Sequence, residues 1–235
     1  MSFISNLISE LERSTAGSAQ TAKEVMRLCG NVTAKRALFV GDDFDTPKII
    51  AEATGAEVLA GYAEQNRAER ALNMKINAKQ VMTYELPHGS QQDGGWEFLW
   101  YNGLSEPDGV SNRLEEIKSI LTSGGVAVFR TLCYLIEPSL DTRSYVERRF
   151  GRPEELDRVL REAKENGLKI RDFYIAPKTD WTRGLYEPLR EAMHKLEAAR
   201  EDDDEVSGIA ELNKEMDMFE LHSEEYSFVY YILQS

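Results

Sequence analysis

The chain is organised around the stretch AKRALFVGDDFDTPKIIAEATGAEVLAGYAEQNRAERAL, which spans Ala34 to Leu72. Its first apolar run, Arg36 to Val40, is typical of a buried strand. Thr46 and Pro47 predict a helix start, with threonine at the N-cap and proline at the first helical position. Gly55 ends that helix, and a second short strand follows. A strand–helix–strand unit of this size predicts a right-handed parallel crossover, with a ligand crevice at the carboxyl ends of the strands.

The rest of the chain continues the alternation of short apolar runs with segments of helical period. The apolar runs predict strands over 36–40, 57–61, 80–83, 96–101, 126–131, 168–176 and 226–233. Apolar residues at helical spacing predict helices over 3–13, 18–29, 110–121, 153–165, 189–200 and 206–221, and the segment 139–151 is irregular or helical. These elements indicate an α/β fold with a mainly parallel sheet of seven strands, the last two forming an antiparallel edge pair. We expect three parts: N-terminal helices over 1–33, a sheet domain over 34–176 and 224–235, and a helical insertion, or lid, over 177–223.

Length and composition exclude several classes of function. The 235 residues allow one α/β domain with an insertion, or at most two small domains. The net charge of -13 repels phosphate backbones, so we expect no nucleic-acid binding. We expect no membrane span, because no apolar run approaches the roughly 20 residues required, and no signal peptide. The two cysteines, Cys29 and Cys133, form no disulfide framework, which favours a cytoplasmic location.

Several segments together resemble the class I S-adenosylmethionine-dependent methyltransferases, in particular their small-molecule type 11 group. The matching segments, in chain order, are GSAQTAKEVMRL, GAEVLAGYAEQNRAERA, ELP, EFLWYNG, LTSGG, DWTRGLYEPL and YSFVYYIL. The resemblance covers most of the chain and rests on the order and spacing of these segments. It implies a Rossmann-like sheet in the strand order 3-2-1-4-5-7-6, with helices on both faces, and S-adenosylmethionine as the cofactor.

The resemblance also implies where that cofactor is held. A glycine-rich turn after the first strand lets the backbone approach the methionine part, and an acid just before it helps to hold the ammonium group. Acids after the second and third strands bind the ribose hydroxyls and the adenine amino group. On this sequence the implied cofactor-binding residues are Gly41, Asp42, Asp43, Asp45, Tyr62, Ala63, Glu64, Tyr84, Glu85 and Asn102.

The sequence departs from the family pattern at this site. Phe39, Tyr62 and Met82 stand where the family has acids, and Asp43 and Asp45 stand where it has glycines. In one reading the cofactor still binds, and an aspartate of the turn pairs with its ammonium group. In the other, the aspartates fill the site and occupy the positive helix N-terminus, and the domain survives as a scaffold. In both readings the aspartates cap the helix that follows.

The acceptor side of the crevice is predicted from the carboxyl ends of the fourth and fifth strands and from the insertion. The substrate-side candidates are Tyr101, Arg130, Thr131, Tyr134, Trp181 and Tyr186. The last two aromatic residues either close over the crevice mouth or anchor the insertion to the sheet. His88 and His194 are candidates for a general base only because imidazole titrates near neutrality, and surface or capping roles suit them better. The acidic run EDDDE is typical of a solvated helix turn, so no metal site is predicted.

The sequence therefore favours methyl transfer from S-adenosylmethionine to a small-molecule acceptor. Such transfer depends on positioning the acceptor atom in line with the methyl carbon, and the sequence names no catalytic residue. The alternative is a non-catalytic methyltransferase-like subunit that has lost its cofactor site and binds a partner protein. Its partner in a homo- or hetero-oligomer would be a related methyltransferase subunit. A third reading is an α/β domain that binds another ligand in the same crevice.

Overall fold

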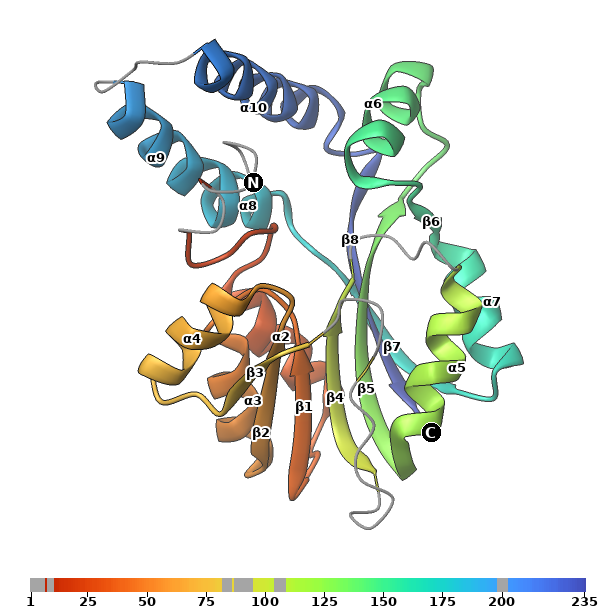
Figure 1. Ribbon diagram of the computed structural model, residues 1–235. Coiled ribbons are helices and arrows are strands. Elements are labelled where there is room, and N and C mark those ends of the chain that lie inside the picture. Colours follow the sequence, from red (N-terminus) through yellow and green to blue (C-terminus); the bar gives the residue numbers. More distant parts are fainter. Residues whose placement is uncertain (1–6, 8–10, 82–85, 87–94, 104–108, 198–202) are drawn as a thin grey trace.

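The computed structural model describes residues 7, 11–81, 86, 95–103, 109–197 and 203–235, and Figure 1 labels its elements. Its strands are β1 (Arg36–Val40), β2 (Glu57–Tyr62), β3 (Ala78–Gln80), β4 (Trp96–Asn102), β5 (Leu121–Tyr134), β6 (Glu154–Glu155), β7 (Lys169–Ile175) and β8 (Tyr226–Gln234). Its helices are α2 (Ala19–Cys29), α3 (Thr46–Thr54), α4 (Gln65–Asn73), α5 (Val110–Ile120), α6 (Leu140–Phe150), α7 (Leu156–Glu165), α8 (Lys178–Trp181), α9 (Glu187–Glu197) and α10 (Asp203–His222). A π-helical turn, η1 (Thr182–Tyr186), joins α8 to α9.

The strands form one mixed sheet in the order β3-β2-β1-β4-β5-β8-β7, with the short β6 paired to the end of β5. Strand β1 pairs in parallel with β2 and β4, and β4 pairs in parallel with β5. Strand β8 is antiparallel to both β5 and β7. Strands β7 and β8 are the sixth and seventh predicted strands, because the short β6 was not predicted. This arrangement therefore confirms the predicted α/β fold and strand order. Because β1, β2, β4 and β5 point the same way, their carboxyl ends meet at one edge of the sheet, the upper edge in Figure 1.

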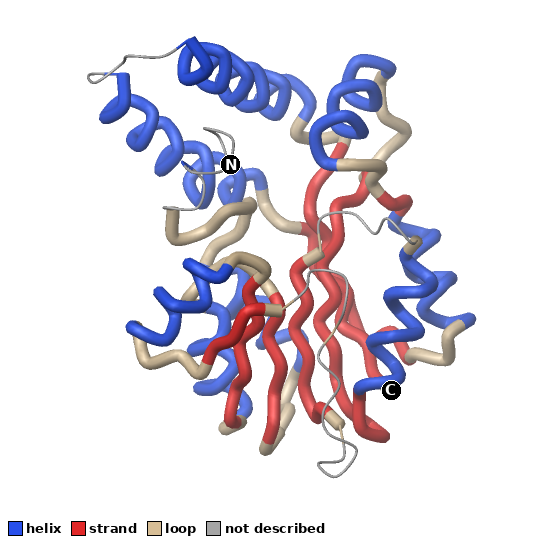
Figure 2. Tube along the Cα trace, viewed as in Figure 1, coloured by secondary structure: helices blue, strands red, loops and turns tan. Residues whose placement is uncertain are grey.

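Helices cover both faces of the sheet, as Figure 2 shows. A buried apolar cluster lies on each face. Helices α2 and α3 pack on one face through side chains that include Val25 and Ile50. Helices α5 and α7 pack on the other through side chains that include Leu114. Adjacent strand residues alternate between the two clusters: Phe39 belongs to the first and Leu38 to the second. Because β1 is buried on both faces, it reads as a continuous apolar run.

The helical insertion stands above the carboxyl edge of the sheet, at the top left of Figure 1. Its buried side chains, among them Leu185, Leu189 and Phe219, belong to the same apolar cluster as α2 and α3. The insertion is therefore packed onto the sheet domain through a shared core. This packing places α8 and η1 close to the turn that precedes α2.

Some predicted boundaries are wrong because a tertiary pairing competes with the local signal. The third strand, predicted from 80, begins at Ala78 and pairs with β2 up to Gln80, and 82 and 83 of the predicted range lie outside the described residues. The helix predicted from 153 begins at Leu156, because the two residues before it pair with the end of β5. Strand β5 spans Leu121–Tyr134, longer than the predicted 126–131, because β8 pairs with it up to Tyr134.

Three further expectations can be compared only with the described residues. The helix predicted over 3–13 falls largely outside them, since only 7 and 11–13 of that range are described. Within the described ranges, no helix combines the length and apolar character that crossing a membrane requires. In the same ranges, no three His, Cys, Asp or Glu side chains gather in a way that could hold a metal ion.

Candidate functional site

The acidic turn, Gly41 to Asp45, lies at the carboxyl end of β1 and leads into α3. Asp43 caps this helix: its Oδ1 accepts hydrogen bonds from the N–H groups of Asp45 and Thr46 at 3.1 and 2.7 Å. Its Oδ2 accepts a further bond from the Thr46 hydroxyl at 2.9 Å. Thr46 is therefore the first helical residue and not the N-cap that the sequence predicted. A charged carboxylate is a stronger acceptor for the free amides of a helix N-terminus, which is why Asp43 takes the cap.

Asp42 is bound by the segment that precedes α2. Its Oδ2 accepts hydrogen bonds from the N–H and hydroxyl of Ser14, each at 3.0 Å, and from the Thr15 hydroxyl at 2.8 Å. Burial alone would raise the pKa of Asp42, but the Arg130 guanidinium and the Thr15 hydrogen bond outweigh it and lower that pKa. Asp42 is thus ionised and held in a fixed position.

Arg13 spans the two other aspartates of the turn. Its Nη1 lies 3.2 Å from Asp43 Oδ2, and its Nη2 lies 3.4 Å from Asp45 Oδ2. The Arg13 side chain is only 12% exposed and Asp43 is buried, so this pair is poorly screened by solvent, whereas the pair with the half-exposed Asp45 is more strongly screened. Burial acts to lower the pKa of Arg13, but Asp43 and Asp42 outweigh it and raise that pKa. Arg13 therefore supplies the cation that faces the acidic turn.

Two buried arginines hold the backbone of the same N-terminal segment. Arg67, on α4, donates hydrogen bonds to the carbonyl oxygens of Leu11 and Asp42. Arg130, on β5, donates to the Ala16 carbonyl at 3.0 Å and to the Thr15 hydroxyl at 2.9 Å. Burial lowers the pKa of Arg67, and Asp42 partly offsets that effect. Residues 11–16 are consequently fixed against the carboxyl edge of the sheet from two sides.

A small cavity of about 180 Å³ remains at the centre of this edge. Its walls are Ser14, Thr15, Val40, Gly41, Asp42, Ala63, Val81, Tyr101, Asn102 and Arg130. Asn102 is oriented by the Trp100 indole N–H, which donates to its Oδ1 at 2.7 Å. The cavity thus brings together six of the residues implied as cofactor-binding or substrate-side with two hydroxyls that the sequence did not single out.

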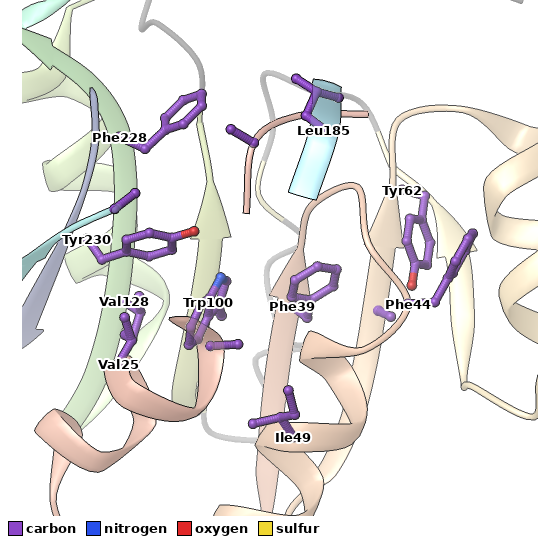
Figure 3. Close-up of a cluster of buried hydrophobic side chains, with 14 of the residues drawn as sticks. Val25, Phe39, Phe44, Ile49, Tyr62, Trp100, Val128, Leu185, Phe228 and Tyr230 are labelled. Carbon is purple, nitrogen blue, oxygen red and sulfur yellow. The ribbon is translucent and has the colours of Figure 1, made fainter. Parts of the chain in front are cut away.

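Tyr62, at the position of the ribose acid, is turned into the core. Its hydroxyl donates to the Asp43 carbonyl at 3.1 Å, and its ring lies 5.6 Å from that of Phe44. Figure 3 shows Tyr62 beside Phe44 in the buried cluster. Burial, with Asp43 beside it, raises the pKa of Tyr62 above its ordinary range. Glu64 is partly exposed and lies 3.9 Å from Arg67. The remaining residues of the implied set, Tyr84 and Glu85, fall outside the described residues, as do Met82 and His88.

The substrate-side candidates on the sheet point in different directions. Tyr101 stacks on Phe129 with 5.9 Å between ring centroids, in the cluster under α5 and α7, although it also reaches the small cavity. Thr131 is fully buried. Tyr134 lines a separate cavity of about 300 Å³ beside β6 and α7, and burial raises its pKa to about 12. Of the predicted residues on β5, only Arg130 therefore lies at the small cavity.

Trp181 and Tyr186 are packed inside the molecule. The Trp181 indole stacks between Phe219 and Phe228, with centroid distances of 4.7 and 5.1 Å, and donates to the Ser227 hydroxyl at 3.3 Å. The Tyr186 hydroxyl donates to Glu215 Oε1 at 3.4 Å. Trp181 joins the insertion to β8, and Tyr186 packs against Trp181 and α10 within the insertion, which is the anchoring arrangement.

The sequence interpretation missed Arg13, Ser14, Thr15 and Arg67 as parts of this site. A signal existed for Arg67, because it is an arginine on the apolar face of a short helix, next to Ala68. No signal existed for residues 13–15, since their partners lie at least 27 positions away along the chain.

Comparison with known proteins gives the fold. No family model matches the sequence, and no curated protein matches it. The X-ray structure of YjhP from E. coli superposes with a TM-score of 0.78 and 14% identity, covering 98% of this chain and 97% of that one. Methyltransferases from Geobacter sulfurreducens and Thiobacillus denitrificans, both S-adenosylmethionine-dependent and in complex with S-adenosyl-L-homocysteine, each superpose with a TM-score of 0.76 and 14% identity. Each superposition covers 99% of this chain and 98% of the chain it is compared with. Together with the strand order, these matches show that the chain has the class I fold of S-adenosylmethionine-dependent methyltransferases.

Proposed function

We propose that this chain is an S-adenosylmethionine-dependent methyltransferase that acts on a small-molecule acceptor. The observation that carries the proposal is the charge arrangement around the small cavity at the carboxyl edge. The Asp42 carboxylate and the Arg130 guanidinium both line that cavity, together with the amide of Asn102. This set is complementary to an amino-acid zwitterion, the group at the methionine end of the cofactor.

The described residues fit that end of the cofactor. Asp42 would hold the ammonium group, and Arg130, whose Nε is buried without a hydrogen-bond partner, would hold the carboxylate. When bound, S-adenosylmethionine supplies an electrophilic methyl group on a sulfonium. The contribution of this chain is to bind and orient the donor and to exclude water under the helical insertion.

The nucleoside end fits less well in this conformation. The cavity of about 180 Å³ is smaller than the about 300–1,000 Å³ typical of small-molecule sites. Tyr62 cannot accept the ribose hydroxyls while its own hydroxyl is bound to the Asp43 carbonyl inside the core. Cofactor binding therefore requires the volume of this cavity to increase.

The inward position of Tyr62 and the paired aspartates also favour a second candidate function, that of a non-catalytic methyltransferase-like subunit. In that function the cavity never opens to the cofactor, and the fold serves to bind a partner protein. The two functions differ in whether S-adenosylmethionine binds at all.

Calorimetric titration with S-adenosylmethionine and S-adenosylhomocysteine tests the proposal. We expect measurable binding by the full chain, and we expect Asp42→Asn to weaken it by about one to two decades through loss of a charged hydrogen bond. Asparagine keeps an acceptor for Ser14 and Thr15, so the fold around the turn should survive. The control is Asp141→Asn, at an exposed position on α6. Undetectable binding at millimolar cofactor contradicts the proposal. A stable complex reconstituted from this protein and a purified methyltransferase would then support the second function.

A further inference from the structure

We propose that residues 11–16 form a latch that keeps the cofactor cavity closed, and that withdrawal of Arg13 from the acidic turn opens it. This inference rests on the proposed function and adds a means of regulation: the latch occupies Asp42, the carboxylate proposed to hold the cofactor's ammonium group. Arg13 pairs with the other two aspartates of the turn and so holds Ser14 and Thr15 against Asp42.

Arg13 is the side chain that closes the latch. It bridges Asp43 and Asp45 at 3.2 and 3.4 Å while remaining mostly buried. Its pairing neutralises two of the three carboxylates of the turn. The third, Asp42, accepts three hydrogen bonds from the next two residues of the same segment. The segment therefore engages every aspartate of the turn within three consecutive residues.

The latch is attached firmly at one end. The Gly17 N–H donates to the Asp180 carbonyl at 3.2 Å, which ties the end of the segment to α8. Gly184 lies against the same residue so closely that an added Cβ would be 2.1 Å from the Gly17 carbonyl oxygen. Ser18 then caps α2 by accepting a hydrogen bond from the Thr21 N–H. Residues 17 and 18 are thus a fixed pivot, and opening of the latch would break the bonds from Arg67 to Leu11 and from Arg130 to Ala16.

There is space for that movement. A second cavity of about 770 Å³ lies on the other side of the segment, between it and the π-helical turn and α9. Leu11, Glu12 and Arg13 form one wall of this cavity, and Gly184 and Pro188 lie on another. A displacement of residues 11–16 towards α9 would enlarge the small cavity at the expense of the large one. Arg13 already lines the large cavity, which gives its guanidinium a place to move to when it leaves the turn.

The expected consequence is that the latch lowers the apparent affinity for the cofactor. If only the open form binds, the measured dissociation constant equals the intrinsic one divided by the open fraction. Removing the Arg13 side chain raises the open fraction, and we expect Arg13→Ala to bind S-adenosylmethionine about tenfold more tightly than the wild type. Thr15→Val removes the hydroxyl shared by Asp42 and Arg130 and should act in the same direction.

The experiment combines hydrogen–deuterium exchange of the full chain without ligand with calorimetric titration of S-adenosylmethionine. The matched control is Arg27→Ala, an arginine whose side chain is 71% exposed on α2. The latch is supported if Arg13→Ala speeds amide exchange over 11–16 and tightens cofactor binding, while Arg27→Ala does neither. Unchanged exchange over 11–16 overturns it, because Arg13 then does not hold the segment. Faster exchange with an equal, measurable affinity also overturns it and leaves the proposed function standing. Binding by no variant at millimolar cofactor overturns both. Tighter binding by Arg13→Ala without methyl transfer supports the latch and contradicts the proposed function alone.

Discussion

Phe39 and Gly41 are packed against each other at the end of β1. An added Cβ on Gly41 would lie 2.4 Å from the Phe39 ring and 2.8 Å from the Asn102 Nδ2. Phe39 is the residue that stands in place of an acid, and its ring is fully buried in the cluster under α2 and α3. The glycine at 41 is therefore required by the neighbouring side chains of this chain, whether or not a ligand binds.

We accordingly expect Gly41→Ala to lower the free energy of unfolding by about 1–3 kcal/mol through overpacking. Urea denaturation would measure this. In the Phe39→Leu background the loss should be smaller, because leucine lacks the ring atom that the new methyl group meets. Strict additivity of the two substitutions would contradict this explanation.

At the scale of the elements, the insertion is held by one aromatic cluster and one polar turn. Trp181 contributes the centre of the cluster, between Phe219 and Phe228. At the other end, the turn between α10 and β8 is joined to the loop after β5 by Glu225. Its carbonyl accepts from the Leu135 N–H at 2.8 Å, and its carboxylate accepts from the Ser139 N–H at 2.7 Å. These contacts make the insertion part of the folded domain.

Trp181→Ala should therefore behave as a core truncation, with a loss of about 3–5 kcal/mol in the free energy of unfolding. Tryptic cleavage within α9 should also become faster, because the helix loses its attachment to the sheet. Leu140→Ala, at an 82% exposed side chain on α6, is the control and should change stability little. If Trp181→Ala left stability unchanged, the residue would be a cover over the crevice and not an anchor.

Glu225 predicts a dependence of stability on pH. Burial acts to raise its pKa, but hydrogen bonds from His222 and Ser139 outweigh it and lower the pKa from 4.5 to about 2. A carboxylate with a depressed pKa in the folded state stabilises fully above its ordinary pKa and loses that effect as the pH falls towards the folded-state value. Wild type should thus be more stable than Glu225→Gln at pH 6, and the difference should shrink between about pH 4.5 and 2. Thermal melts across this range would measure it, with Glu224→Gln as the control. A constant difference would show that the carboxylate charge is not involved.

At the scale of the whole molecule, the two helical layers give the protein two cores on one sheet. Cys29 lies in the cluster under α2 and α3, and Cys133 lies in the cluster under α5 and α7. Burial raises the pKa of each thiol to about 12. Each core thus contains one thiol that is protected from solvent and protonated.

We expect neither thiol to react with an aromatic disulfide reagent in the native protein at pH 8. Both should react when the molecule unfolds, and the rate should rise steeply with urea concentration as the sheet opens from both sides. The fully unfolded chain, which should label at both positions, gives the reference. Rapid labelling of one thiol under native conditions would mean that its helical layer opens alone.

The sequence by itself determined the alternation of strands and helices, the buried character of β1 and the general placement of the insertion. These features depend on residues within about one element of each other, so periodicity and turn residues record them. The strand order followed from the order of the segments that resemble a known family. A capped helix after β1 could also be predicted, since three aspartates precede a proline. The sequence could not predict which aspartate caps the helix, because that depends on where each carboxylate points.

Only the tertiary structure decided how the site is filled. The contact between Arg130 and Thr15 joins residues 115 positions apart, and Arg67 reaches the backbone of Leu11 across 56 positions. The spacing of residues along the chain does not predict such contacts. The two-residue strand β6 and the inward position of Tyr62 were hidden for the same reason. Local sequence sets the conformation of a segment, whereas the partner of a buried charge is whichever opposite charge the completed fold places beside it.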